Sequence, residues 1–317
     1  MSNIAAPFRS RVLSAFTGNA SGRPDWVSQI EEGDDAGFFG AGSAAWAVHG
    51  GMATLVAGIR ALLMQTLHPG AMAGVHDWSR YKEDPLGRLS GTIQWLISVT
   101  FSDTTMAVRE SNRVGRFHDR VTGTYLDAQG VERTYAAGDP ELLSWVHVVF
   151  TDAFLGSHLV WGSPIPGGPD QYVREWKKAG ELVGVLDPPA SEAELHAQLD
   201  AFRTSGILKS DERVAEAVRF IRHPGLPKGM LPAYKILFAG AVASIPVEYR
   251  RMLGLRVRGG RRSRPRASSS YWSGNCSAAA PPVRMPPVNA WLVSVCTDDL
   301  WLSPATGRFF LEMRKTR

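Results

Sequence analysis

Apolar residues recur at three- and four-residue spacing from position 41 to about position 256, and alternating runs of β-branched residues are few. This pattern predicts helices. The segment SAAWAVHGGMATLVAGIRALLMQTL is apolar nearly all round, as expected of a helix buried on most sides. The tripeptide His68-Pro69-Gly70 predicts that this helix ends or kinks there. The fold class that follows is all-α, with one large helical domain.

Start signals place the helices that follow. An Asp before a Pro is a good N-terminal signal, and it occurs at Asp84-Pro85 and at Asp139-Pro140, while Asp103 marks a start between them. Turn residues between 122 and 139 flank a short run and predict a loop or small hairpin. The pattern predicts four later helices, at 169–184, 191–204, 210–222 and 230–252.

The positive charge of the chain is concentrated at its C-terminal end. The whole sequence of 317 residues has 35 Lys and Arg against 30 Asp and Glu, but residues 256–317 alone hold 11 basic and 3 acidic residues. This part is rich in Arg, Ser, Gly and Pro and has no clear periodicity. A disordered tail, a nucleic-acid arm and the product of a shifted reading frame all fit, and the disordered tail is favoured because aromatic residues are not interleaved with the charges.

These changes in composition predict three segments. Residues 1–40 form an N-terminal segment that is partly helical or flexible, residues 41–255 form the helical domain, and residues 256–317 form the irregular basic tail. The 44 % of hydrophobic residues in the chain can supply a sizeable core for the middle segment.

The sequence favours a cytoplasmic protein. Its two cysteines, Cys276 and Cys296, form neither a disulfide framework nor a CxxC pair. The N-terminus lacks the apolar core and cleavage site of a secretory signal. The run LPAYKILFAGAVASIP has sixteen residues and includes Lys235, whereas a membrane span needs about twenty apolar residues. We therefore expect no transmembrane segment.

Two histidines interrupt apolar stripes on predicted helices. His118 shares a helical face with Ala107, Ser111, Val114 and Val121. His147 shares one with Leu143, Phe150 and Phe154. Each helix is therefore predicted to direct a histidine inward. Such a stripe suits haem, with imidazole on the iron and an apolar wall for the porphyrin, but it equally describes a helix core that holds a neutral histidine. The spacing leaves both interpretations open.

Other chemistries find little support in the motifs. The sequence has no GxGxxG between a strand and a helix, no GxxxxGK followed by Ser or Thr, no HExxH, no GxSxG and no pair of ExxH motifs. Asp152 lies five residues after His147 and therefore on a different helical face, which argues against a facial triad on this helix. Haem remains as the best candidate cofactor, partly by exclusion.

Three segments together resemble a known family. RALLMQTLHPGAMAGVHDWSRYKEDPLGRLSGTIQWLISVTFSD, NRVGRFHDRVTG and DPELLSWVHVVFTDAF are similar to the catalytic domain shared by bacterial rubber oxygenases (latex-clearing proteins) and the endoplasmic-reticulum-bound oxygenase of mycophenolic acid biosynthesis. The signatures LHP, DPLGRL, RVxxxH and WVH occur in order, and the resemblance covers about residues 40–255. It is closer to the broad bacterial branch than to the rubber-cleaving branch itself.

The resemblance implies an all-α domain of the rubber oxygenase type around a buried haem b pocket, with oxygen-dependent chemistry. His147, in the sequence SWVHVV, matches the histidine that is the proximal iron ligand in the rubber-cleaving branch. Arg113 matches a distal arginine, but Arg116 and Phe117 stand where that branch has Lys and Thr. The sixth coordination position is then open, filled by water, or approached by a side chain such as His118.

Two further residues belong to the family signatures. His68 of LHPG lies at a predicted helix end, where it would cap carbonyl groups or reach a haem propionate, and the capping role is favoured. Arg88 of DPLGRL would pair with a propionate or with a nearby acid. His49, His76, His196 and His223 have no comparable motif and receive no functional interpretation.

The sequence thus predicts a haem b-dependent oxygenase that acts on a hydrophobic small molecule with dioxygen, without a nucleic-acid partner. His147 would bind the iron, and Arg113 with His118 would orient oxygen or substrate. The alternative is a non-catalytic haem-binding protein, or a purely helical one, of the same fold.

Overall fold

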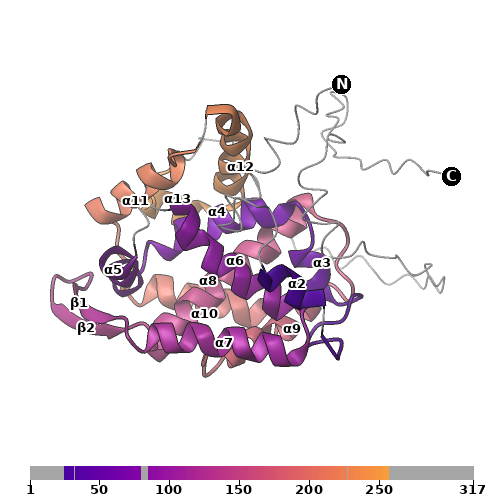
Figure 1. Ribbon diagram of the computed structural model, residues 1–317. Helices are drawn as coiled ribbons and strands as arrows, with labels where there is room; N and C mark the ends of the chain where they lie inside the picture. The colour runs from indigo at the N-terminus through magenta and orange to yellow at the C-terminus, as the bar shows by residue number, and fades with distance from the viewer. Residues whose placement is uncertain (1–24, 32, 80–84, 227, 257–317) are drawn as a thin grey trace.

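The computed structural model describes residues 25–31, 33–79, 85–226 and 228–256. The elements in chain order are α2 (Asp25–Glu31), α3 (Ala44–His49), α4 (Ala53–Gln65), α5 (Pro69–Trp78), α6 (Pro85–Phe101), α7 (Thr104–His118), β1 (Thr122–Leu126), β2 (Glu132–Ala136), α8 (Pro140–Trp161), α9 (Pro169–Leu182), α10 (Glu192–Thr204), α11 (Glu212–Arg222), the 3-10 turn η1 (Lys228–Met230), α12 (Leu231–Ser244) and α13 (Val247–Met252). Helices dominate the described residues (Figure 1). The all-α prediction is confirmed.

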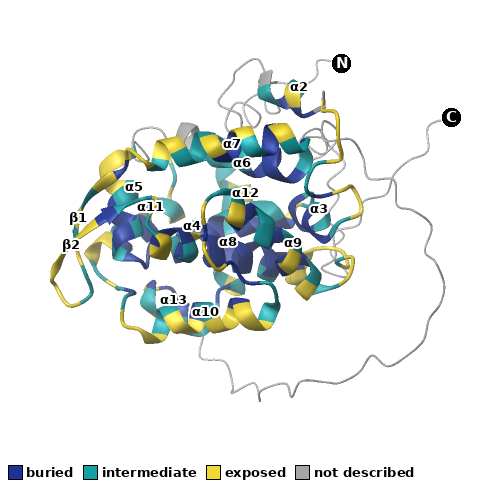
Figure 2. Ribbon diagram, turned by 90° about the horizontal axis from the view of Figure 1, so that it is seen from below, coloured by how far each residue is buried: buried dark blue, intermediate teal, exposed yellow. Residues whose placement is uncertain are grey.

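Helix α8 forms the centre of the molecule. It has 22 residues, and most of its middle is buried because apolar side chains cover every side of it. It packs most extensively against α4 and also against α9, α10 and α12. Figure 2 shows the buried residues gathered on α8 and on the sides of α4 and α9 that face it, with exposed residues on the outer helices. The core is therefore built around the helix that carries His147.

The apolar character of α8 comes from this packing. Among the described residues it is the one helix that is long and apolar enough to cross a membrane, but 67 % of its most apolar stretch is buried inside the molecule. The central helix of a helical domain has the same composition, so α8 is weak evidence for a membrane span.

Several predicted starts and turns are confirmed. The Asp103 carboxylate accepts a hydrogen bond of 2.8 Å from the Met106 amide and caps α7. Helix α6 begins at Pro85 as predicted, although Asp84 lies outside the described residues. Asp139 precedes α8 as predicted, but its carboxylate accepts from the Ala136 amide, 2.7 Å away, and so fastens the end of β2 to the helix. The predicted hairpin is the antiparallel pair β1 and β2.

The predicted helix over residues 43–67 is wrong in one respect, because it is two helices. Helix α3 ends at His49 and α4 begins at Ala53. The pair Gly50-Gly51 lies between them, and glycine is a poor helix former because its backbone loses most freedom on ordering. The Thr54 hydroxyl donates to the His49 carbonyl over 3.0 Å and satisfies one end of the broken helix. The break turns α3 toward α9.

Two other differences from the predicted helices arise at prolines. Pro69 starts a new helix, α5, which the pattern did not predict. The predicted helix over 230–252 is divided into α12 and α13 at Ile245-Pro246, because proline lacks the amide donor that would continue the helix and disfavours helical backbone at the residue before it. Residues 1–24 and 257–317 lie outside the described residues, so the interpretations of the N-terminal segment and of the tail stay predictions.

Candidate functional site

His147 lies in the middle of α8 with its ring buried, and the residue is 6 % exposed. Its Nε2 atom has no hydrogen-bond partner among the described residues. Burial lowers the pKa of this imidazole to about 4, since a charged ring would lose its hydration. Buried polar atoms are nearly always paired, so a neutral ring nitrogen without a partner is a candidate ligand atom.

A glycine on the neighbouring helix makes room for this ring. A Cβ atom built at Gly180 of α9 would lie 2.8 Å from His147 Cε1 and 3.0 Å from Nε2. These distances are shorter than carbon contacts in packed interiors, so any side chain at this position would displace the imidazole. The ring of His147 therefore occupies a cradle that exists because residue 180 has no side chain.

Aromatic rings form a wall on the same helix, starting one turn beyond His147. Phe150 and Phe154 stack with ring centroids 4.1 Å apart. Trp176 of α9 stacks on Phe150 at 5.8 Å, and Trp95 of α6 meets Phe150 edge-on at 6.2 Å. The imidazole in ring contact with this wall is that of His49, with its centroid 4.2 Å from that of Trp176 and 4.9 Å from that of Phe154. Large planar apolar rings are the kind of surface against which a porphyrin packs.

His49 is a buried residue that the sequence did not identify as functional. It is 1 % exposed at the end of α3, and its Nε2 lies 2.9 Å from the Tyr172 hydroxyl. Its Nδ1 lies 3.2 Å from the Thr100 hydroxyl. Burial lowers the pKa of His49 well below its ordinary value, and the nearby His158 lowers it further. The signal in the sequence was a polar residue within a run that is apolar all round.

The buried histidines predict that the protein loses stability in acid. Burial lowers the pKa of both His49 and His158 below the ordinary 6.5, whereas the unfolded chain titrates near that value. Below about pH 6.5 the unfolded chain therefore takes up protons that the folded chain does not. The free energy of unfolding should be largest above this pH and should fall below it, as measured by urea unfolding from about pH 8 to about pH 5.

Two variants show whether the buried histidine rings cause the loss of stability at low pH. His49→Gln keeps an amide that can bond Tyr172 but removes one titrating ring, so the stability should fall less steeply with decreasing pH. His223→Gln removes an exposed ring and serves as the matched control. Equal slopes in the two variants would contradict the assignment to the buried ring.

Arg113 is held by a buried acid on its own helix. Its Nε donates to Glu110 Oε2 at 2.6 Å, and Glu110 is only 5 % exposed. Gln94 of α6 donates to the same carboxylate at 3.1 Å, and one Arg113 nitrogen lies 3.4 Å from the Gly91 carbonyl. Arg113 thus joins α7 to α6 and balances a buried charge.

His118 lies at the surface end of the same helix. It is the last residue of α7 and is only partly buried, with its ring centroid 6.3 Å from that of Phe117. The expectation that both striped helices direct a histidine into the interior is therefore met by His147 and not by His118. Other described elements do not bury the apolar stripe at the end of α7. The periodicity of the sequence does not show where the helix ends, so it did not reveal that His118 is the last residue.

His68 has a capping role, but at a helix start. It is fully buried at the N-cap of α5, where its Nδ1 accepts the Ala71 amide at 3.4 Å. Its Nε2 lies 3.2 Å from Glu141 Oε1. The expected capping of carbonyl groups is wrong, because Pro69 begins a new helix here. Arg88 lies in the first turn of α6, and its side chain is outside the described residues, so its propionate role stays a prediction.

Asp152 is committed to an ion pair. Its Oδ2 accepts from Arg60 Nη2 of α4 at 2.5 Å, and the two side chains are 8 % and 4 % exposed. Gly156 leaves the space for the guanidinium, since a Cβ there would lie 2.1 Å from Arg60 Nη1. In the described part of the chain no three side chains of His, Cys, Asp or Glu gather as metal ligands. A porphyrin supplies four iron ligands itself, so one axial imidazole is sufficient.

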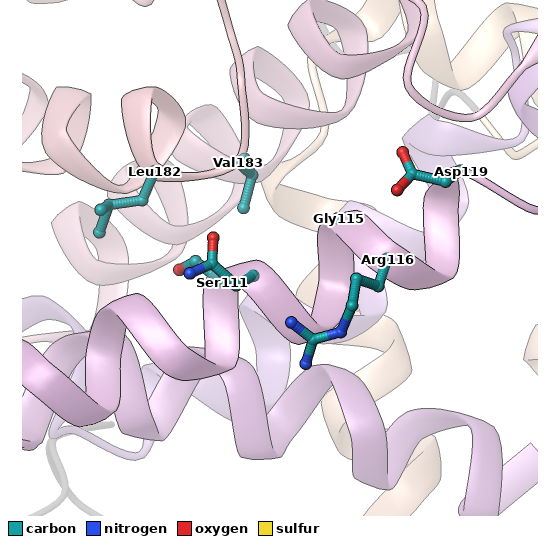
Figure 3. Close-up of a pocket in the computed structure, with 7 residues that line it drawn as sticks. Ser111, Gly115, Arg116, Asp119, Leu182 and Val183 are labelled. Atoms are coloured by element: carbon teal, nitrogen blue, oxygen red, sulfur yellow. The ribbon is translucent and has the colours of Figure 1, made fainter.

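A shallow pocket lies between α7 and the C-terminal end of α9 (Figure 3). It is lined by Ser111, Asn112, Gly115, Arg116, Asp119, Leu182 and Val183. Its volume of about 270 Å³ is just below the range of roughly 300–1,000 Å³ that is usual for small-molecule sites. The Trp95 indole donates to the Ser111 hydroxyl at 3.2 Å, so the pocket wall is joined to the aromatic wall.

The fold and the site together define an all-α domain whose central helix carries a buried imidazole with no hydrogen-bond partner for its Nε2 among the described residues. A family model described as the catalytic domain of the ER-bound oxygenase mpaB/B' and rubber oxygenase matches residues 46–276. The chain belongs to this family of oxygenase catalytic domains. Neither the curated proteins nor the solved structures gave a match to the chain. The family supports oxygenase activity in general, and the resemblance expected from the sequence is confirmed.

Proposed function

We propose that the protein is a haem b-dependent oxygenase that acts on a hydrophobic small molecule and binds the iron through His147. The observation that carries this proposal is the buried Nε2 atom of His147, which has no partner among the residues described. Gly180 gives the imidazole of His147 room on α9, and Phe150 with Phe154 supplies, from one turn further along α8, the kind of apolar surface that a porphyrin would need.

His147 is suited to hold iron at neutral pH. Because its pKa is about 4, the imidazole is neutral at pH 7, so one of its two ring nitrogens carries no proton and can bind a metal. The ring is kept in place by its packing on Gly180 and within α8. Haem, when bound, would supply the binding and activation of dioxygen, while the chain sets the axial ligand, the polarity and the access.

The pocket beside α7 is the proposed substrate side. Leu182 and Val183 give it an apolar wall, which favours a hydrophobic substrate, and Arg116 places a permanent positive charge at its edge. Arg113 does not line this pocket and faces α6, and its proposed catalytic part would be played by the nitrogen atoms that Glu110 does not occupy, since its side chain is 40 % exposed. His118 would act from the end of α7.

One observation favours the alternative, a haem-binding protein without turnover. Arg113 already has a structural partner in Glu110, so its presence needs no catalytic explanation. The two functions separate in one experiment on the full chain expressed with added haem precursor. A Soret band and oxygen consumption with apolar substrates support the oxygenase; a Soret band without oxygen consumption supports the binding protein; the absence of a Soret band would overturn both.

Gly180→Ala tests the cradle. In an ordinary helix position this change stabilises by up to about 1 kcal/mol, but here the new Cβ would lie 2.8 Å from His147 Cε1 and push the imidazole aside. We expect lower haem occupancy and a shifted Soret band in the absorption spectrum. Gly58→Ala in α4 is the matched control, because the Cβ there meets no described atom within 4 Å. Full occupancy with an unchanged spectrum in Gly180→Ala would argue against ligation from this ring position.

A further inference from the structure

Helix α12 is apolar on every side, yet most of it is not buried. The structure describes this helix throughout, and it has one charged side chain, Lys235, and one buried residue, Ala241. Helix α8 is apolar all round as well, but it is buried along most of its length. Ile236, in the middle of α12, is 65 % exposed. The outer side of α12 is therefore an apolar surface that faces water.

This surface adjoins the end of α8 and the start of α4. A Cβ atom built at Gly240 would lie 3.6 Å from the Trp161 ring of α8 and 3.6 Å from Val56 Cγ1 of α4, so the three helices meet there. Figure 1 shows α12 standing beside α4 on the outside of the helical domain. Exposed apolar residues of α8 and α12 gather at this place, and we call them the α12 face: Leu159, Val160, Trp161 and Ile236. Contiguous apolar side chains on a surface mark a site of interaction.

The charges on and beside the α12 face are positive. Lys235 is exposed on α12 itself, and Lys228 is exposed in η1, the turn that leads into α12. The Arg222 guanidinium lies over the Phe238 ring of α12, with its Cζ atom 5.5 Å from the ring centroid. Helices α4 and α12 and residues 153–161 of α8, all of them described, contain no Asp or Glu. The α12 face is thus an apolar surface with a basic edge.

The acids that follow these elements in the chain lie elsewhere. Asp170, the first acid after Trp161, accepts a backbone amide at the start of α10 over 2.7 Å. Glu248, the first acid after α12, lies near Arg203 of α10. The two acids of α11 are in its first half, whereas Arg222 is its last residue. The positive charges beside α12 therefore remain available to an anionic partner.

We propose that the α12 face docks the protein on a lipid bilayer that contains anionic lipids. Trp161 and Ile236 enter the boundary between headgroups and acyl chains, where tryptophan is favoured, and Lys235 extends from the same helix to the lipid phosphates. A docked protein meets apolar molecules dissolved in the lipid, but the docking does not depend on the proposed oxygenase function.

Charge favours the bilayer over two other occupants. A second copy of the chain would bring its own Lys235 and Arg222 to the face, so that like charges would meet. Residues 256–317 hold 11 basic and 3 acidic residues, so as an occupant they too would add positive charge. Anionic headgroups supply the opposite charge, and their acyl chains supply the apolar contact.

Flotation of the full-length chain with lipid vesicles tests the docking. Vesicles of equal parts phosphatidylglycerol and phosphatidylcholine should carry the protein, and vesicles of phosphatidylcholine alone should carry much less of it. Lys235→Gln should weaken the affinity for the mixed vesicles about fivefold. Added salt should weaken it as well, because ions screen the headgroup charge.

An acid placed on the α12 face should prevent docking. Ile236→Asp removes apolar area and is repelled by the headgroups, so most of the flotation should be lost. Leu186→Asp is the matched control, because Leu186 is 80 % exposed and follows Gly184, which lies against Leu143 near the opposite end of α8 from Trp161. Both variants keep residues 256–317, so the charges of that segment affect them alike.

Trp161 reports which surface meets the lipid. Brominated phosphatidylcholine in the mixed vesicles quenches the fluorescence of a tryptophan that reaches the acyl chains, so Trp161→Phe should lose much of the quenching. Trp78→Phe is the control, because Trp78 is also exposed but is bonded to the Thr122 carbonyl beside the hairpin. Its quenching should equal that of the wild-type chain.

Three results would overturn the proposal: a wild-type chain that does not float with the mixed vesicles, equal flotation of Ile236→Asp and Leu186→Asp, or unchanged quenching in Trp161→Phe. Sedimentation of the lipid-free protein tests the second copy. A dimer that Ile236→Asp dissociates would show that another copy covers the face, and it would refute docking on lipid. The Soret band reports the proposed function separately, so the failure of one proposal is distinguishable from the failure of the other.

Discussion

Replacing His147 by alanine should remove the Soret band of the haem-loaded protein while the helix content is retained. If His147 holds the iron as proposed, the change removes that bond, and the apolar contacts that remain would not hold a porphyrin in one orientation. Loss of the ring from the core costs on the order of a few kcal/mol, as other large-to-small changes do. Absorption spectra and far-ultraviolet circular dichroism of the two proteins check this expectation.

Two variants on α7 serve as controls for the His147 variant. His118→Ala and Arg113→Ala should keep haem, because His118 is only partly buried and Arg113 is paired with Glu110. They should change the spectrum or the rate of oxygen consumption. Loss of haem in His118→Ala as complete as in His147→Ala would indicate two histidine ligands, and full retention of haem in His147→Ala would refute the ligand assignment.

The helices that the sequence predicted well carry their own start signals. Asp103 caps α7, and Pro140 opens α8 at the expected positions, because these signals act within one turn of the chain. The break at Gly50-Gly51 and the new helix at Pro69 were missed, although glycine and proline stand in the sequence at both places. The apolar pattern runs unbroken across Gly50-Gly51, so it predicts one helix there although two adjacent glycines disfavour a helix.

The site was predicted only in part, because its partners come from distant positions. The stripe and the WVH signature point to His147 as a candidate residue, but they give no sign of the cradle at Gly180, since a glycine gives no periodic signal. The bond from His49 to Tyr172 joins residues 123 positions apart, and that from Arg60 to Asp152 spans 92. Contacts over such separations depend on how helices pack, which one sequence does not give.

Asp152→Ala should be the most destabilising single change among the ion pairs described. It leaves the Arg60 guanidinium, 4 % exposed, as an uncompensated charge inside the core. Breaking a buried pair in this way costs about 3–5 kcal/mol, which is a large part of the roughly 5–15 kcal/mol that stabilises a typical domain. Urea unfolding followed by circular dichroism should show a lower midpoint with an unchanged slope.

The control for this prediction is an ion pair of similar type at the surface. Asp200→Ala removes the partner of Arg203, but the Asp200 side chain is 64 % exposed and water replaces the contact, so the cost should be about 0–1 kcal/mol. The double variant Arg60→Leu with Asp152→Leu should recover much of the loss, because apolar side chains need no partner in the core. Equal stability of Asp152→Ala and Asp200→Ala would mean that the Arg60 charge reaches water once Asp152 is removed. The pair of Arg60 and Asp152 would then not be a buried link between α4 and α8.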